Sequence, residues 1–275
     1  MKHALRFLDT GARTGAQNMA LDEALVHTVQ AGGKPVLRLY SWAPPAVSLG
    51  YAQDAEGELD LIACRTAGVN VVRRPTGGRA VLHWDELTYS AVFPIEDVPF
   101  AARIEDLYET VGACLVAGIR RLGIDVELER GQARPPRARS GTAALPCFSS
   151  IARSEVKWQG RKLVGSAQRR FRGAVLQHGS ILLGSAHERL VDWLRIEPEQ
   201  KDMWRQRLRA DSTCLRECVD RPIDRTELIE SLAAGFSEVI HCELVRDEIE
   251  PREWAHCLER SNFWNAEARP VEAAH

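Results

Sequence analysis

Five short segments between residues 36 and 93 constrain the fold of this chain more than any other feature of its sequence. They span residues 36–42, 47–51, 69–74, 80–83 and 87–93, and they are rich in β-branched and aromatic residues. Proline and glycine punctuate the intervals between them, which is typical of strands joined by turns. We therefore expect this part of the chain to be mostly sheet.

Other segments show helical periodicity or further strand patterns. Asn18 is expected to cap a helix that ends before Gly32-Gly33, and apolar residues recur at helical spacing from 104 to 122. A hairpin is expected with its turn at Gln159-Gly160. The remaining expected strands are 126–129, 155–158, 161–165 and 173–183, and the remaining helices are 187–194, 203–208, 227–239 and one starting near 254. With no repeat and no clear linker, residues 1–275 should form a single domain, helical from about residue 185 onward.

Composition limits the possible partners and compartments. Among 275 residues, 36 Lys and Arg nearly balance 38 Asp and Glu, so the net charge of -2 gives no field that attracts nucleic acid or membrane. No apolar run approaches the roughly 18 residues of a spanning helix, and the first residues lack the core of a signal peptide. The odd number of cysteines, seven, indicates reduced thiols, and Cys214 and Cys218 lack a second ligand pair. We expect a cytoplasmic protein without a metal site.

The segment RRPTGGRAVLH at 73–83 joins one expected strand to the next through paired glycines. Gly77 and Gly78 would let backbone approach a ligand closely, and the flanking Arg73, Arg74 and Arg79 could hold a phosphate. No phosphate-loop pattern is present, so an ordinary hairpin turn with solvated arginines is the favoured interpretation.

Lys162 and His178 each stand in a strand-like segment with apolar neighbours. Desolvation lowers the pKa of a buried ammonium group, so Lys162 is a candidate proton shuttle, although its stem can equally extend to solvent. Gly179 after His178 suggests that a ligand or a second backbone passes close, whereas a hydrogen-bonded core histidine is the stronger interpretation of His178.

Cys147 follows a long basic stretch, residues 131–146, that lacks any periodicity. A thiol there can react as a nucleophile if nearby cations such as Arg137, Arg139 or Lys162 raise its thiolate fraction. The structural alternative is an inert thiol tucked under Phe148, because free cysteines are often simply buried.

Three ordered segments, 6–25, 73–90 and 160–183, resemble the lipoate/octanoate protein ligase and transferase family, in particular its cysteine-dependent octanoyltransferases. The resemblance implies an α+β fold, a mixed sheet flanked by helices that is shared with the catalytic domain of biotin protein ligases. It also implies transfer of an octanoyl group from octanoyl-acyl-carrier protein to a lysine of a lipoyl domain, such as the glycine-cleavage H protein. No cofactor is implied, because the thioester donor is already activated.

The resemblance also implies roles for residues of this chain. Cys147 stands fifteen residues before Lys162, as in the family, and would carry the octanoyl thioester, with Lys162 as the proton acceptor. The implied substrate-binding set is Arg74, Gly77, Gly78, His83, Gly165, Ser166 and His178. Where relatives often have an acidic residue and an aromatic pair after the Cys-Phe pair, this chain has Ser149, Ser150, Arg153 and Ser154, and Glu155 keeps its place. A basic run, Arg134, Arg137, Arg139, Arg161, Arg169, Arg170 and Arg172, is a candidate docking surface for acidic carrier domains or an ordinary solvated face.

Two other functions remain open at this point. An ATP-dependent lipoate-protein ligase shares the implied fold and lysine, but many ligases add an accessory domain, and about fifty residues after Pro222 are few for one. A non-catalytic protein that binds acyl groups or lipoyl domains is the second alternative. The presence of both Cys147 and Lys162 argues against it.

Overall fold

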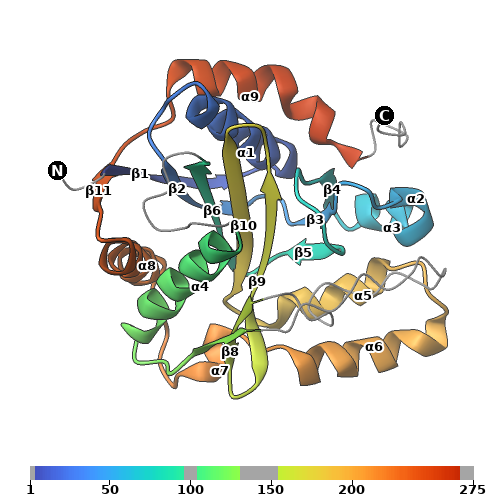
Figure 1. The fold of residues 1–275 in the computed structure, drawn as a ribbon. Helices are drawn as coiled ribbons and strands as arrows, with labels where there is room; N and C mark the ends of the chain where they lie inside the picture. The colour runs from blue at the N-terminus through green and yellow to red at the C-terminus, as the bar shows by residue number, and fades with distance from the viewer. Residues whose placement is uncertain (1–3, 96–103, 131–153, 267–275) are drawn as a thin grey trace.

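A mixed eight-stranded sheet runs through the computed structural model, which describes residues 4–95, 104–130 and 154–266 (Figure 1). The strand order is β11-β1-β2-β6-β10-β9-β8-β7. β1 pairs in parallel with β11 and β2, and the other neighbours are antiparallel. The strands are β1 Ala4–Arg13, β2 Val36–Trp42, β6 Glu86–Pro94, β7 Glu127–Arg130, β8 Ser154–Trp158, β9 Arg161–Arg170, β10 Ala174–Leu182 and β11 Glu243–Arg246. The expected α+β fold with a mixed sheet is confirmed.

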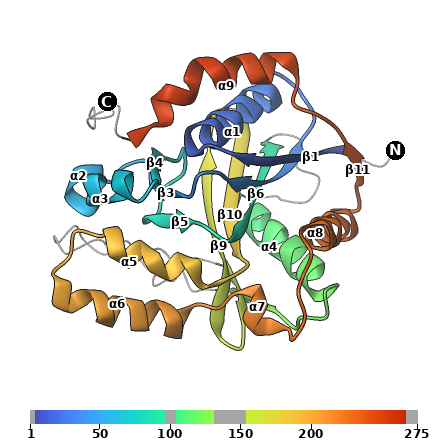
Figure 2. The same cartoon turned by 180° about the vertical axis from the view of Figure 1, so that it is seen from behind.

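Helices cover both faces of this sheet. Figures 1 and 2 show α1 and α9 together on one side and α4 and α8 on the other. Alternate residues of β2 point to opposite faces of the sheet. Leu37 and Leu39 pack in the cluster with α4 and α8, while Val36 packs with α1. Burial on both faces explains why the strand segments read as almost continuous apolar runs. The longer helices are α1 Gly15–Gln30, α4 Ile104–Arg120, α6 Pro198–Asp211, α8 Arg225–Ile240 and α9 Pro251–Trp264.

A second, three-stranded sheet lies beside the first and has β3 (Ala46–Leu49) at its centre. β4 (Asn70–Arg73) pairs in parallel with β3, and β5 (Val81–His83) pairs antiparallel with it on the other side. Loop 74–80 therefore connects two strands that are not neighbours, and the expected hairpin turn at Gly77-Gly78 is wrong. Shorter helices complete the fold, namely α2 Ala55–Glu58, α3 Leu61–Thr66, η2 Ser185–Arg189, α5 Leu190–Trp193 and α7 Leu215–Cys218.

The beginning and the end of the chain differ from expectation. Helix α1 begins three residues before Asn18, because Thr14 caps it by accepting a hydrogen bond from Gln17 N, so the predicted cap is wrong. Asn18 is buried inside the helix instead. Strand β11 was not expected, and its pairing with β1 makes the C-terminal portion more than a set of helices. Within the described ranges, no helix combines the length and the apolar character needed to cross a bilayer.

The contact between α4 and α8 depends on glycine. A methyl group on Gly235 of α8 would lie 2.4 Å from Gly118 N and 2.5 Å from Cys114 O, both backbone atoms of α4. A methyl group on Gly112 of α4 would instead meet Leu128 Cδ1, the end of a flexible side chain, at 2.7 Å. At Gly235 the backbones of the two helices are therefore in direct contact, whereas at Gly112 the neighbour is a side chain.

We expect Gly235→Ala to lower the free energy of unfolding by about 1–3 kcal/mol, since overpacking here outweighs the better helix propensity of alanine. Gly112→Ala is the matched control, and it should cost clearly less because Leu128 can rotate away. Urea denaturation of both variants measures the difference, and equal losses would contradict the close backbone approach.

Candidate active site

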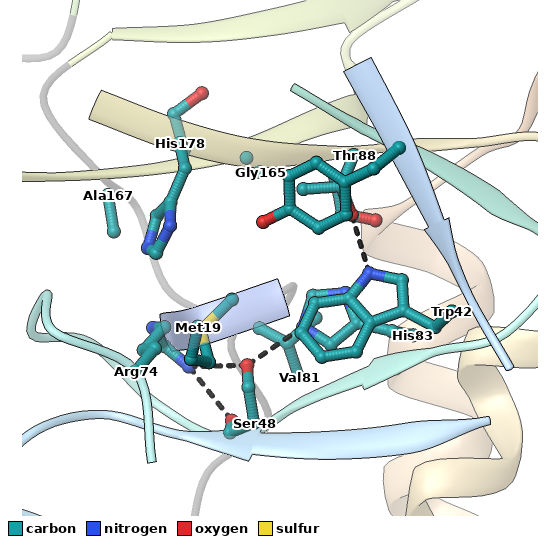
Figure 3. A pocket seen from close by; sticks show the side chains of 14 residues that line it. Met19, Trp42, Ser48, Arg74, Val81, His83, Thr88, Gly165, Ala167 and His178 are labelled. Atoms are coloured by element: carbon teal, nitrogen blue, oxygen red, sulfur yellow. Dashed lines mark hydrogen bonds between the residues drawn. The ribbon is translucent and has the colours of Figure 1, made fainter. Parts of the chain in front are cut away.

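A cavity opens between the two sheets (Figure 3). Met19, Tyr40, Trp42 and Val81 give it apolar walls, and strands β9 and β10 supply backbone and small side chains. An apolar lining with a few polar groups is typical of a small-molecule site. The residues that line it are Met19, Tyr40, Trp42, Ser48, Arg74, Val81, His83, Thr88, Gly165, Ser166, Ala167, His178, Gly179 and Ser180.

The structure brings together most residues of the predicted site. The cavity is lined by Arg74, His83, Gly165, Ser166 and His178, which come from four separate segments of the chain. The other predicted residues stand apart. Gly77 and Gly78 lie in loop 74–80 without lining the cavity, Lys162 lies three residues before Gly165 on β9, and Cys147 lies outside the described residues.

Arg74 holds loop 74–80 in shape. Its Nη1 donates to Ser48 O at 2.8 Å, while its Nη2 donates to the carbonyl oxygens of Gly77 and Arg79, each at 2.8 Å. Gly78 has a φ of +101°, and a methyl group there would lie 2.6 Å from Arg74 Nη2. Glycine at this position therefore makes room for the guanidinium group. The contacts of Arg74 are those of a loop support rather than of a phosphate ligand.

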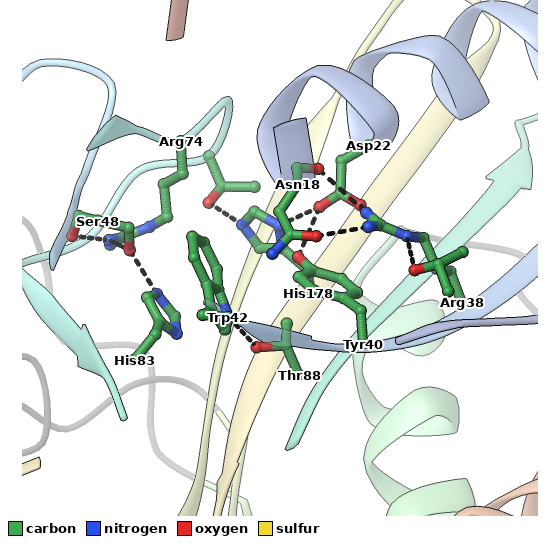
Figure 4. A network of polar contacts seen from close by, with 12 residues as sticks. Asn18, Asp22, Arg38, Tyr40, Trp42, Ser48, Arg74, His83, Thr88 and His178 are labelled. Atoms are coloured by element: carbon green, nitrogen blue, oxygen red, sulfur yellow. Dashed lines mark hydrogen bonds and ion pairs between the residues drawn. The ribbon is translucent and has the colours of Figure 1, made fainter. Parts of the chain in front are cut away.

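A buried polar network lies behind one wall of the cavity, to which it contributes Tyr40 and His178 (Figure 4). Asp22 accepts hydrogen bonds from Arg38 Nη1 at 2.8 Å and Tyr40 Oη at 3.1 Å, and its Oδ2 lies 2.9 Å from His178 Nδ1. The other ring nitrogen of His178 lies 2.6 Å from Thr76 Oγ1. His178 is thus a hydrogen-bonded core histidine that also faces the cavity, and it joins helix α1 to loop 74–80.

Arg38 completes this network and sets its charge. Its guanidinium group also donates to Asn18 Oδ1 at 2.6 Å and to Thr10 Oγ1 at 3.0 Å, and it stacks over the Tyr40 ring at 3.8 Å. Burial alone would raise the pKa of Asp22, but the hydrogen bond from His178 and the charge of Arg38 outweigh burial and hold that pKa below its ordinary value. A charged carboxylate with internal partners therefore lies behind the wall of the cavity.

A second polar group lies across the cavity from His178. His83 stacks on Trp42 with ring centroids 4.0 Å apart, and its Nε2 lies 2.8 Å from Ser48 Oγ. Burial lowers the pKa of His83 below its ordinary value of 6.5, more than nearby Glu86 raises it. Ser48 was not predicted from the sequence. The signal for it there is a hydroxyl residue between the apolar Val47 and Leu49, and the position is buried in the structure.

Lys162 does not extend to solvent. Its side chain is buried, and its Nζ lies 2.6 Å from Glu155 Oε1, so strands β9 and β8 are joined by a buried ion pair. The backbone of Lys162 also accepts a hydrogen bond from Thr213 N at 2.9 Å, which connects β9 to the segment after α6. Of the two interpretations of this lysine, burial is the one the structure confirms.

Together, the mixed sheet, the glycine-supported loop and the apolar cavity define an α+β small-molecule-binding domain. Residues 14–237 match the family model of the lipoyl protein ligase A/B catalytic domain, and the chain belongs to this family. An octanoyltransferase LipM from Symbiobacterium thermophilum is 41% identical over 252 residues, 90% of each chain. A second, from Kyrpidia tusciae, is 39% identical over 257 residues, 92% of this chain and 94% of that protein.

Solved structures give the same picture. The bi-partite lipoate protein ligase of Thermoplasma acidophilum superposes with a TM-score of 0.77 at 26% identity, and the match covers 100% of both chains. The likeness therefore extends over both sheets and over the helices that cover them.

We expect Asp22→Asn to lower the free energy of unfolding by about 3–5 kcal/mol, because it leaves the buried Arg38 charge without a counter-charge. Asp9→Asn is the matched control. Asp9 pairs with Arg225 at the surface, where both side chains are more than a quarter exposed, and its loss should cost less than about 1 kcal/mol. Chemical denaturation measures both, and equal costs would contradict the network's role.

Because of His83, we expect the free energy of unfolding to fall as the pH drops below about 6.5, the ordinary pKa of histidine. Unfolding lets His83 take up a proton that the folded protein resists, so the loss begins at the unfolded pKa and levels off below the folded one. His83→Gln should reduce this acid sensitivity, whereas His241→Asn, at an exposed site, should leave it unchanged. Unfolding free energies between pH 5 and 8 test this, and identical profiles for wild type and His83→Gln would refute it.

Proposed function

We propose that this chain is an octanoyltransferase, which moves an octanoyl group from octanoyl-acyl-carrier protein to a lysine of a lipoyl domain through a thioester on Cys147. The observation that carries the proposal is the cavity, which joins apolar walls to strand-borne polar groups within a chain of this family. The names of the curated relatives support octanoyl as the transferred group.

The apolar walls suit a medium acyl chain. Each buried methylene contributes about 0.8 kcal/mol, so Met19, Tyr40, Trp42 and Val81 favour a chain of several carbons over acetyl. Gly165 and Ser166 of β9 leave space at one side of the cavity, since Gly165 has no side chain. We place the thioester end of the chain on this side, because Lys162 precedes Gly165 on the same strand.

The chemistry proceeds in two halves. Cys147 thiolate attacks the donor thioester, so that a new C–S bond forms and the carrier's thiolate leaves. The acceptor lysine then attacks the Cys147 thioester, so that an amide C–N bond forms and the Cys147 thiolate leaves. No ATP is consumed, because one thioester is exchanged for another before the amide forms.

Lys162 supplies charge and proton transfer in this scheme. A cation next to a thiol favours the thiolate, and an ammonium group can stabilise the oxyanion of each tetrahedral intermediate. The ion pair with Glu155 keeps the ammonium group in one place at 2.6 Å. In the second half, Lys162 gives a proton to the leaving Cys147 thiolate and receives one from the attacking amine.

Both partner domains would dock on a basic surface. Arg170 and Arg172 are exposed at the end of β9 and in the turn that follows, and they suit acidic carrier domains. Two other members of the basic run have internal partners, since Arg161 pairs with Glu217 and Arg169 donates to Pro75 O at 2.7 Å. Arg134, Arg137 and Arg139 lie outside the described residues.

Intact mass after mixing with octanoyl-acyl-carrier protein tests the mechanism. Wild type should gain one octanoyl group that hydroxylamine removes, and Cys147→Ala should gain none by this route. Glu155→Gln should slow acylation at least tenfold, since it loosens Lys162 without removing it. The exposed pair Arg221–Glu227 offers the control Glu227→Gln, which should leave the rate unchanged.

Two outcomes would favour the alternatives. Lipoate transfer that needs ATP and persists in Cys147→Ala would identify a lipoate-protein ligase, the activity named for the Thermoplasma acidophilum structure. Absence of any adduct on wild type, with the acyl chain still bound, would identify a binding protein without turnover.

A further inference from the structure

Ser48 and His83 form a hydroxyl–imidazole pair that the proposed transfer does not use. Ser48 lies on the central strand of the small sheet and His83 at the end of its neighbour β5, and their Oγ and Nε2 atoms are 2.8 Å apart. Both residues line the cavity, and in Figure 3 the two side chains point toward one another at its edge. The distance is that of a nucleophile and its general base.

The surrounding groups fix the direction of this hydrogen bond. Arg74 Nη1 lies 3.1 Å from Ser48 Oγ and can only donate, so the serine oxygen accepts there. His83 Nδ1 lies 3.6 Å from Glu86 Oε2, and a bare nitrogen facing a carboxylate would be repelled. The favoured tautomer therefore carries its proton on Nδ1 and accepts the Ser48 proton at Nε2, as a general base must.

Further contacts orient the imidazole ring and its carboxylate. Trp42 stacks on the His83 ring with an interplanar angle of 12°, and its Nε1 donates to Thr88 Oγ1 at 2.7 Å. Thr88 in turn donates to Glu86, with both carboxylate oxygens 2.8 Å from its hydroxyl. Ser48, His83 and Glu86 thus have the order nucleophile, base and facing carboxylate, with Glu86 near His83 Nδ1 as a charge rather than as a hydrogen-bond partner. Burial keeps His83 neutral near pH 7, the state that can accept a proton.

We propose that Ser48, His83 and Glu86 form a second nucleophilic centre, through which the cavity hydrolyses medium-chain acyl thioesters when no acceptor amine is present. The proposal rests on the proposed function only in that the cavity receives an acyl thioester. Ser48 Oγ attacks the thioester carbonyl, an O–C bond forms, and the C–S bond breaks. The Ser48 proton passes to His83 Nε2 and then to the leaving thiolate.

Water completes the cycle. A water molecule attacks the Ser48 ester while His83 takes one of its protons, and the tetrahedral intermediate releases the carboxylic acid. The proton returns through His83 to Ser48 Oγ, so that the enzyme is regenerated and one thioester has become one thiol and one carboxylate. Arg74 lies beside Ser48 Oγ and stabilises the negative charge that develops there.

The test uses the full chain with Cys147→Ala, which removes the proposed transfer route, and octanoyl-coenzyme A as the probe. Release of thiol and of free octanoate in equal amounts is expected. Adding Ser48→Ala or His83→Gln should lower this hydrolysis at least tenfold. Ser237→Ala is the matched control, because Ser237 lies on α8, does not line this cavity, and donates its hydroxyl to Cys242 O at 2.7 Å. It should retain the rate.

A second measurement separates chemistry from folding. An octanoyl adduct trapped on Cys147→Ala by acid quenching should map to the peptide that contains Ser48 and should resist neutral hydroxylamine, as an ester does and a thioester does not. Equal hydrolysis in the Ser48→Ala and Ser237→Ala variants, or hydrolysis no faster than without enzyme, would overturn the proposal. Octanoyl transfer to a lipoyl domain by wild type is measured separately, so either activity can fail while the other stands.

Discussion

The buried contact between Asp22 and Arg38 is the interaction on which the rest of the site depends. Both side chains are fully buried, so their charges are far from water and each needs the other. Asp22 comes from α1 and Arg38 from β2, and the same carboxylate binds His178 of β10. One charged group therefore fixes a helix, two strands and, through Thr76, the loop that carries the paired glycines.

This arrangement explains how an apolar cavity can have so many polar groups around it. Arg74 donates to carbonyl oxygens, His178 lies between Asp22 and Thr76, and the Trp42 nitrogen donates to Thr88. Because these groups already have protein partners, they present their apolar sides to the cavity and little unsatisfied polarity. An acyl chain can then enter without displacing a strongly held hydrogen bond, which keeps the hydrophobic gain of about 0.8 kcal/mol per methylene intact.

The sequence predicted those parts of the structure that local pattern determines. The strand at 36–42 has the predicted bounds because apolar residues are buried on both of its faces, Leu37 and Leu39 on one and Val36 and Tyr40 on the other. β1 was missed, since its run ALRFLDTGAR mixes charged residues into the strand, and Arg6 is buried only because Glu253 of α9 pairs with it at 2.8 Å. Asn18 has a side chain suited to capping a helix. Thr14 is the cap instead, because Gln17 follows it by three residues and the two form a reciprocal capping box.

The site residues that were predicted lie in recognisable sequence motifs. The site residues that were missed are brought together only by the folding of the chain. Gly165 was implied by the resemblance of segment 160–183, and His178 was also marked by the glycine that follows it, whereas Asp22, Arg38 and Ser48 look like ordinary helix and strand residues. Their roles arise because residues from 16 apart, as Asp22 and Arg38 are, to 156 apart, as Asp22 and His178 are, come into contact. A local sequence pattern does not predict contacts between distant segments, so these residues are identified only from the folded structure.

The positions of the two polar pairs also govern the competition between transfer and hydrolysis. Lys162 and Glu155 lie on the large sheet, while Ser48 and His83 lie on the small one, and the cavity opens between the two sheets. A thiolate is a stronger nucleophile than a serine hydroxyl, so in the two proposed reactions attack by Cys147 would be the faster route for a thioester that reaches both. Hydrolysis then needs both a delayed acceptor and water at Ser48, and the apolar walls formed by Met19, Tyr40 and Trp42 limit that water.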